Sequence, residues 1–129
     1  MQVMAKKKFK IDVWDCYVTI VTTHEECAKA INKSMSDIES YFMTYFDGRN
    51  ALIYIDYNEA KAGGENDLLR IMSHESNHAA YRILDDVGVK VSVENQEALC
   101  YTQDLIFGKV AEFIFKKHGR ANGNSRSSN

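Results

Sequence analysis

The residues best suited to chemistry in this chain lie in the pentad His74-Glu75-Ser76-Asn77-His78, which has the form H-E-x-x-H. In a helix, residues i and i+4 project from one face about 5–6 Å apart, so both imidazoles can reach a single Zn²⁺ ion. Glu75 is rotated by about a third of a turn from His74, so we expect it to reach a water on the metal. Zinc lowers the pKa of such a water toward about 7, and the carboxylate takes its proton as it attacks a carbonyl.

A third ligand is needed, because a catalytic zinc ion normally has three protein ligands and one open position. Glu97 is the favoured candidate, since it lies in the first turn of the next expected helix, after a chain reversal at Gly88. Glu94 is the nearest competitor, although the helix dipole alone favours an acidic residue there. The other candidates have suitable side chains elsewhere in the chain: Cys100, Asp104 and His24.

Tyr101 follows Glu97 by one helical turn and therefore shares its face of the helix. As a catalytic residue it would hydrogen-bond a metal ligand or donate to the oxyanion of the reaction. An ordinary aromatic packing residue has the same pattern, so both interpretations stay open. Asp104, one turn further on, is either an orienting partner for a histidine or a solvated charge.

Two long helices are expected to position these residues. Apolar residues at near-helical spacing run from residue 65 to about 87, and Gly88 is well suited to end that helix. The second helix is expected over about residues 94–117. The pentad lies inside the first, which favours a metal site over two histidines that only decorate an exposed helix face.

The N-terminal half is expected to supply strands and short helices. Residues 9–21 alternate in polarity and predict a hairpin with a tight turn around Asp15, in preference to one long strand. Thr23-His-Glu-Glu26 has the form of a capping box and should begin a helix that ends near residue 34. Residues 36–39 repeat that form, which predicts a second short helix over residues 38–45.

The segment after this helix contains the clearest strand of the chain, the apolar run at residues 51–56. Asp47-Gly48 before it predicts a turn, and Gly63-Gly64 after it predicts a chain break. The aromatic segment at residues 41–46 is either buried packing or an interface, and buried packing is favoured.

Composition limits the classes of function. The chain has 129 residues, of which 45% are hydrophobic and 26% charged, and this is the balance of one ordinary domain. A net charge of −2 gives no general footprint for nucleic acid, and the few clustered lysines are expected to be solubilising. Three cysteines without a CxxC pair, no long apolar run and no signal peptide predict a cytoplasmic protein that binds no membrane.

Residues 73–88, followed by E-N-Q-E-A-L-C-Y at residues 94–101, resemble a known group of proteins. His74 and His78 with a downstream Glu97 are similar to the gluzincin branch of the zincin metallopeptidases, whose ligands are two helical histidines and a glutamate on the next helix. More closely, the stretch looks like small phage-encoded zincin-like proteins. In that group a histidine helix, a Gly-containing turn and an E-N-x-E-A-x-x-Y segment recur in this order.

The resemblance extends over about residues 65–107 and implies zinc bound by His74, His78 and Glu97, with Glu75 as general base. It implies a minimal zincin-like α+β domain over residues 1–118, in which a small mixed or antiparallel sheet packs on the H-E-x-x-H helix and a second long helix follows. Residues 119–129, rich in Gly, Asn and Ser, are expected to be a flexible polar tail. Zincins hold an extended substrate on an edge strand beside the metal. Residues 51–56 are the candidate for that strand, although a plain core strand has the same pattern.

The leading hypothesis is a zinc-dependent hydrolase that cleaves a peptide or amide bond of a peptide or protein substrate, in the host-cell cytoplasm if the chain is phage-encoded. The alternative is a metal-stabilised, non-catalytic module that binds or regulates a phage or host protein. Glu75 favours the enzyme, because a purely structural site needs only its ligands. A metal-free helical interaction protein is the third hypothesis.

Overall fold

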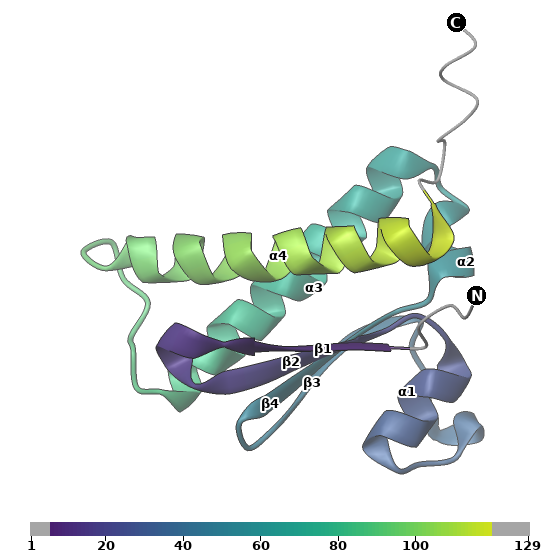
Figure 1. The fold of residues 1–129 in the computed structure, drawn as a ribbon, viewed down its shortest axis with the longest axis horizontal. Helices are drawn as coiled ribbons and strands as arrows, with labels where there is room; N and C mark the ends of the chain where they lie inside the picture. Colours follow the sequence, from purple (N-terminus) through teal and green to yellow (C-terminus); the bar gives the residue numbers. More distant parts are fainter. Residues whose placement is uncertain (1–5, 120–129) are drawn as a thin grey trace, which may run out of the picture.

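Residues 6–119 are described by a computed structural model, in which four strands form one sheet covered by two long helices on one face and a short helix on the other (Figure 1). β1 (Lys6–Ile11) pairs antiparallel with β2 (Cys16–Val21), and β2 pairs parallel with β4 (Asn50–Ile55). β4 pairs antiparallel with β3 (Phe42–Asp47), so β1 and β3 are the sheet edges. The predicted α+β class with a small mixed sheet is therefore confirmed.

The predicted N-terminal hairpin and the helix after it are both present. A single 3-10 turn (Asp12–Trp14) joins β1 to β2, and Asp15 adopts a left-handed backbone with φ 52°. α1 (His24–Ile31) begins with the expected cap, since the Thr23 hydroxyl accepts the backbone N–H of Glu26. The helix ends at Ile31, slightly earlier than expected, because Asn32 adopts the left-handed conformation that stops helices.

The second short helix expected at residues 38–45 was a wrong prediction, because β3 occupies most of that segment. Ser36, which was expected to cap that helix, lies inside a 3-10 turn (Met35–Asp37), where the Ser34 hydroxyl donates to Asp37 at 2.9 Å. Beyond it, aromatic and β-branched residues alternate between the two faces of a strand that pairs with β4. The turn predicted at Asp47-Gly48 joins the two strands, so non-local pairing overrides a local helix signal here.

β4 lies in the interior of the sheet, and Ala51–Ile55 are all buried. Side chains on one face of the sheet pack with the long helices, whereas Leu52 and Tyr54 on the other face pack with α1. A short helix that the sequence did not reveal, α2 (Tyr57–Lys61), follows with Asp56 as its cap. The strand predicted at residues 51–56 is thus present, and it is a core strand.

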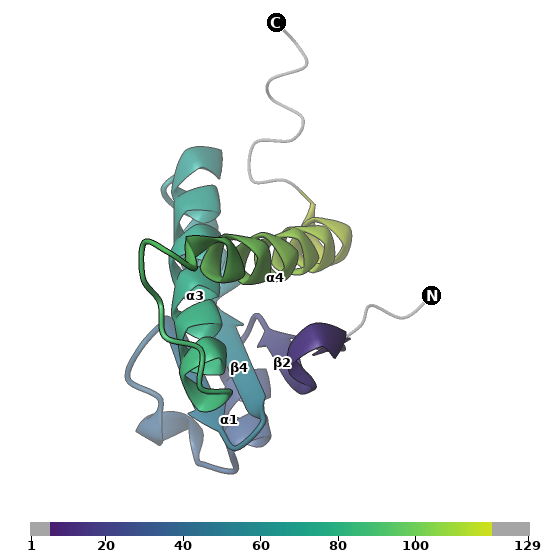
Figure 2. The ribbon, with the colours of Figure 1, turned by 90° about the vertical axis from the view of Figure 1, so that its left-hand side faces the viewer.

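α3 (Glu65–Asp86) and α4 (Gln96–His118) confirm the two predicted long helices. α4 runs obliquely across α3 instead of returning alongside it (Figure 2). Three long-range contacts hold α4 in place: Trp14 donates to Thr102 at 2.7 Å, Gln103 donates to the Ser73 carbonyl at 3.4 Å, and Lys117 pairs with Glu26 at 2.9 Å. Within residues 6–119, no helix is long and apolar enough to cross a bilayer. Apart from Gly119, the predicted polar tail lies outside the described residues.

Candidate metal centre

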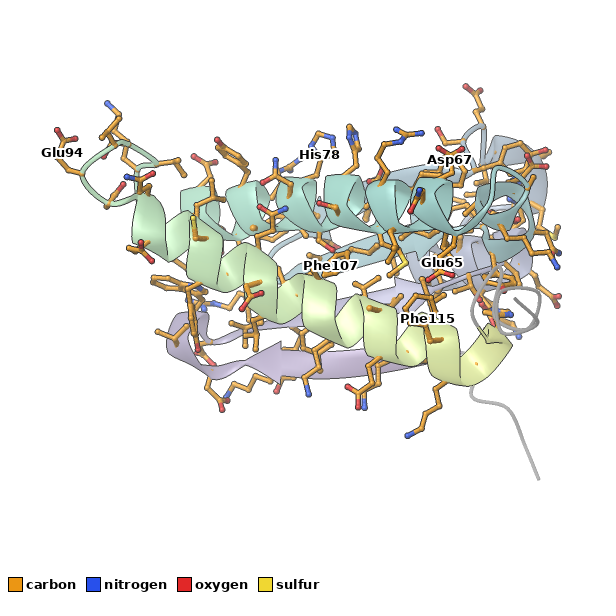
Figure 3. All side chains as sticks on the ribbon, turned by 90° about the horizontal axis from the view of Figure 1, so that it is seen from above. Glu65, Asp67, His78, Glu94, Phe107 and Phe115 are labelled. Atoms are coloured by element: carbon orange, nitrogen blue, oxygen red, sulfur yellow. The ribbon has the colours of Figure 1, made fainter. Side chains whose placement is uncertain are left out.

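His78 projects from the middle of α3, on a side of the helix that α4 does not cover (Figure 3), and the His74 ring lies beside it, one helical turn earlier. Their Nε2 atoms are 3.2 Å apart, and the ring centroids are 4.7 Å apart. Two nitrogens bound to one tetrahedral zinc at 2.0–2.1 Å would be separated by about 3.3 Å. The two imidazoles therefore already have the spacing of two ligands of one ion, although the same distance suits a hydrogen bond between the rings.

Glu75 lies beside this pair but turns toward the sheet, where it is only 5% exposed. The hydroxyl of Thr44 on β3 donates to Glu75 Oε1 at 2.8 Å and lies 3.1 Å from the Glu75 carbonyl oxygen. The Thr44 hydroxyl thus orients the carboxylate, as a group next to a metal site commonly does. Thr44 was not among the predicted site residues, because the sequence placed it in a helix.

An open groove runs between α3 and β3, with the His74 and Glu75 side chains at its centre. Two depressions of about 480 and 360 Å³ meet there and share Phe42, His74 and Glu75. The first is completed by Glu59, Asp67, Arg70 and Ile71. The second is completed by Met43, Thr44, His78, Tyr81 and Arg82. The groove has room for an elongated ligand lying across the candidate catalytic group.

The strand beside the groove is β3, and no other strand of residues 6–119 pairs with its outer edge. Asp47 and Asn50 pair across a two-residue turn, and near the other end of the strand the Asp56 N–H donates to the Tyr41 carbonyl at 2.9 Å. Hydrogen-bonded pairs alternate along an antiparallel ladder, so the odd-numbered residues of β3 direct their backbone groups to β4. Phe42, Thr44 and Phe46 consequently direct their backbone N–H and C=O groups away from the sheet. The prediction that residues 51–56 form the substrate strand was therefore wrong, because β4 has a neighbour on both sides.

The structure does not bring Glu97 to the histidines. Within the described part of the chain, no three His, Cys, Asp or Glu side chains are arranged to hold one metal ion. Glu97 is exposed in the first turn of α4, and Glu94 before it lies far along the molecule from His78 (Figure 3). The physical reason is the oblique crossing of α4, which moves its first turns away from the middle of α3. The role of Glu97 as third ligand stays a prediction and would require movement of α4.

The remaining candidates also lie apart from the pair. Tyr101 is 53% exposed on α4, whereas Cys100 and Asp104 line a shallow depression between α3 and α4 with Ser73 and Gln103. His24 hydrogen-bonds through Nδ1 to Tyr54, which packs on the α1 face of the sheet. The gathered site therefore consists of two histidines, Glu75 and Thr44.

Comparison of the chain with family models, with curated proteins and with solved structures finds no match.

Proposed function

We propose that this chain is a zinc-dependent hydrolase of peptide or amide bonds, built on a minimal zincin-like arrangement, in which His74 and His78 bind the ion and Glu75 is the general base. The observation that supports this most directly is the 3.2 Å separation of the two Nε2 atoms beside a buried carboxylate. A structural zinc site would not require that carboxylate.

Zinc bound there would lower the pKa of a water and polarise the scissile carbonyl. The Thr44 hydroxyl occupies Glu75 Oε1, so Oε2 is the atom that takes the proton of the attacking water and then passes it to the leaving amine. Because Thr44 holds the carboxylate in one orientation, little reorganisation is needed at the moment of transfer.

An extended peptide is the substrate that fits the groove. The free backbone groups of Phe42, Thr44 and Phe46 can pair with a peptide strand, which is recognition by strand addition. Such a strand would run along the groove over the histidines and Glu75. The zincin resemblance assigns this role to an edge strand, and the position of β3 at the edge of the sheet beside the groove supports β3 as that strand.

Glu97 remains the expected third ligand under this proposal, and Tyr101 would approach with it to hydrogen-bond a metal ligand or to donate to the oxyanion. Both lie on the first turns of α4, which are reached through the connection at residues 87–95. Among residues 6–119 the Glu97 carboxylate forms no ion pair, and the side-chain hydrogen bonds that hold α4 begin only at Thr102, so a shift of the turn before it toward His78 would complete the site.

Elemental analysis and zinc titration of purified variants test the metal site. We expect one zinc per chain, lost in His74→Ala and in His78→Ala and weakened in Glu97→Gln, with Glu94→Gln as the matched control. Glu75→Gln should keep the zinc and abolish cleavage of a library of quenched fluorescent peptides. Zinc binding that survives both histidine changes, or cleavage that survives Glu75→Gln, would refute the proposal.

A non-catalytic, metal-stabilised binding module is the second candidate. It is favoured by the groove beside the edge strand β3, because strand addition binds an extended peptide without any need to cleave it. The two functions differ in one measurement. A binding module keeps its partner and its biological effect in Glu75→Gln, whereas the hydrolase loses the effect and retains zinc.

A further inference from the structure

The groove between α3 and β3 has a negative end. Near Phe42 it is lined by Glu59, Asp67 and Arg70. Arg70 donates to Asp67 at 2.6 Å, so these two charges largely cancel. Glu59 takes part in none of the ion pairs found within residues 6–119, and its carboxylate gives this end its net charge.

The opposite end is positive. Arg82 lines it, and its guanidinium lies over the ring of Phe46 at 5.4 Å from the centroid. No carboxylate forms an ion pair with Arg82 in the described range, and apart from Glu75 at the centre the lining there carries no other charge. An unpaired guanidinium held on an aromatic ring is well placed to bind an acidic group.

The direction of β3 relates these ends to the direction of a bound peptide. β3 runs from Phe42 at the negative end to Phe46 at the positive end. Antiparallel strand pairs outnumber parallel pairs two- to three-fold, so an added peptide is expected to run the other way. Its N-terminal part then lies near Arg82 and its C-terminal part near Glu59.

We propose that the groove selects an extended peptide with an acidic side chain on the N-terminal side of the reacting bond and a basic side chain on the C-terminal side. That a peptide bond reacts in this groove rests on the proposed function, whereas the preference for these charges rests only on the residues that line the groove. Phe42 and Phe46 are four residues, or about 13 Å, apart along the strand. Residues i and i+4 of an extended peptide face the same side, so both charges can point to α3 at that spacing.

Two blocked, fluorescein-labelled peptides of identical composition test this proposal: Gly-Glu-Thr-Val-Thr-Lys-Gly and Gly-Lys-Thr-Val-Thr-Glu-Gly. Binding is measured by fluorescence anisotropy at low ionic strength, where rim charges act most strongly. The zinc-loaded Glu75→Gln protein is used so that neither peptide is cleaved. Two exposed charge pairs are together worth about three- to tenfold in affinity, and we expect that preference for the peptide with glutamate first.

The double variant Glu59→Lys/Arg82→Glu should reverse the preference. Glu112→Lys/Lys116→Glu, which exchanges two exposed charges on α4, is the matched control and should keep it. Equal affinities, preference for the lysine-first peptide, or no binding of either peptide at millimolar concentration would overturn the proposal.

Zinc content, measured on the same samples, separates this proposal from the proposed function. Zinc without a charge preference overturns the substrate class alone. A glutamate-first preference in a protein that binds no zinc overturns the hydrolase and leaves the groove selective.

Discussion

Replacing Lys117 by Met should destabilise the protein by about 3–5 kcal/mol, whereas Arg70→Met should cost less than about 1 kcal/mol. The ammonium of Lys117 lies 2.9 Å from Glu26 Oε2 and donates to the Thr22 hydroxyl at 2.9 Å. The Lys117 and Glu26 side chains are 8% and 19% exposed, against 71% and 43% for Arg70 and its partner Asp67. Methionine replaces the apolar stem of the lysine but lacks the ammonium, so the change removes mainly the charge and its hydrogen bonds.

The magnitude follows from the two charge-assisted hydrogen bonds that are lost, each worth about 1.5–3 kcal/mol. Glu26 keeps its bond from the Thr22 N–H, at 3.0 Å, but loses the one ion pair that it forms within residues 6–119. Burial raises the pKa of Glu26, but the bonds from Thr22 and Lys117 outweigh it and hold that pKa below the usual 4.5. The stabilisation is therefore present above the unfolded pKa and is lost as pH falls through the folded pKa, so the difference from wild type should shrink in acid.

Urea unfolding followed by circular dichroism at pH 7 measures the effect, and a loss of about 3 kcal/mol would also lower Tm by roughly 10 °C. Glu26→Gln serves as a second variant from the other side of the pair. A Lys117→Met protein that loses no more stability than Arg70→Met, with unchanged m-value, would refute the reasoning.

Three further changes test other parts of the structure. Burial, and after it the nearby Lys117 charge, lower the pKa of His118, so the free energy of unfolding should fall as pH drops below about 6.5. In urea unfolding at several pH values, His118→Gln should weaken this pH dependence. The same pH dependence in His118→Gln and wild type would contradict the prediction. Thr44→Val should keep zinc and lower peptide hydrolysis by about 10–100-fold, because Glu75 loses its orienting hydroxyl; an unchanged rate would assign Thr44 to packing alone. Gly48→Ala should cost about 1–2 kcal/mol in urea unfolding from its φ of 63° alone, since nothing crowds the added methyl group, and a neutral change would contradict that left-handed turn.

The parts of the fold that could be predicted are those with a local physical signature. α3 was predicted because its apolar residues recur at helical spacing over many turns and glycines stand beyond both ends. The same signature placed His74 and His78 on one helix face, and the structure sets their Nε2 atoms 3.2 Å apart. The capping box at Thr23 was equally local, and α1 begins where it predicts.

The parts that could not be predicted depend on residues far apart in the chain. β3 was mistaken for a helix because Ser36 begins an S-x-x-E sequence, whereas the segment is a strand through its pairing with β4. The distance of Glu97 from His78 follows from the crossing of α4 over α3, which contacts from Trp14 and Gln103 hold in place. The spacing of residues within one helix does not determine the angle at which α4 crosses α3. The Thr44–Glu75 contact was missed for the same reason.

The two edges of the sheet differ in how they meet another copy of the chain. β1 presents Lys6, Lys7, Lys8 and Lys10, and like charges of this kind discourage strands of separate molecules from pairing. β3 instead has three aromatic residues, a methionine and a threonine, with a charge only at Asp47. Any pairing of two copies through the sheet would therefore use β3, and it would leave only the lysine-rich β1 edges on the outside. Such growth ends at a dimer, and the dimer would conceal both grooves until dilution or a peptide separated the copies.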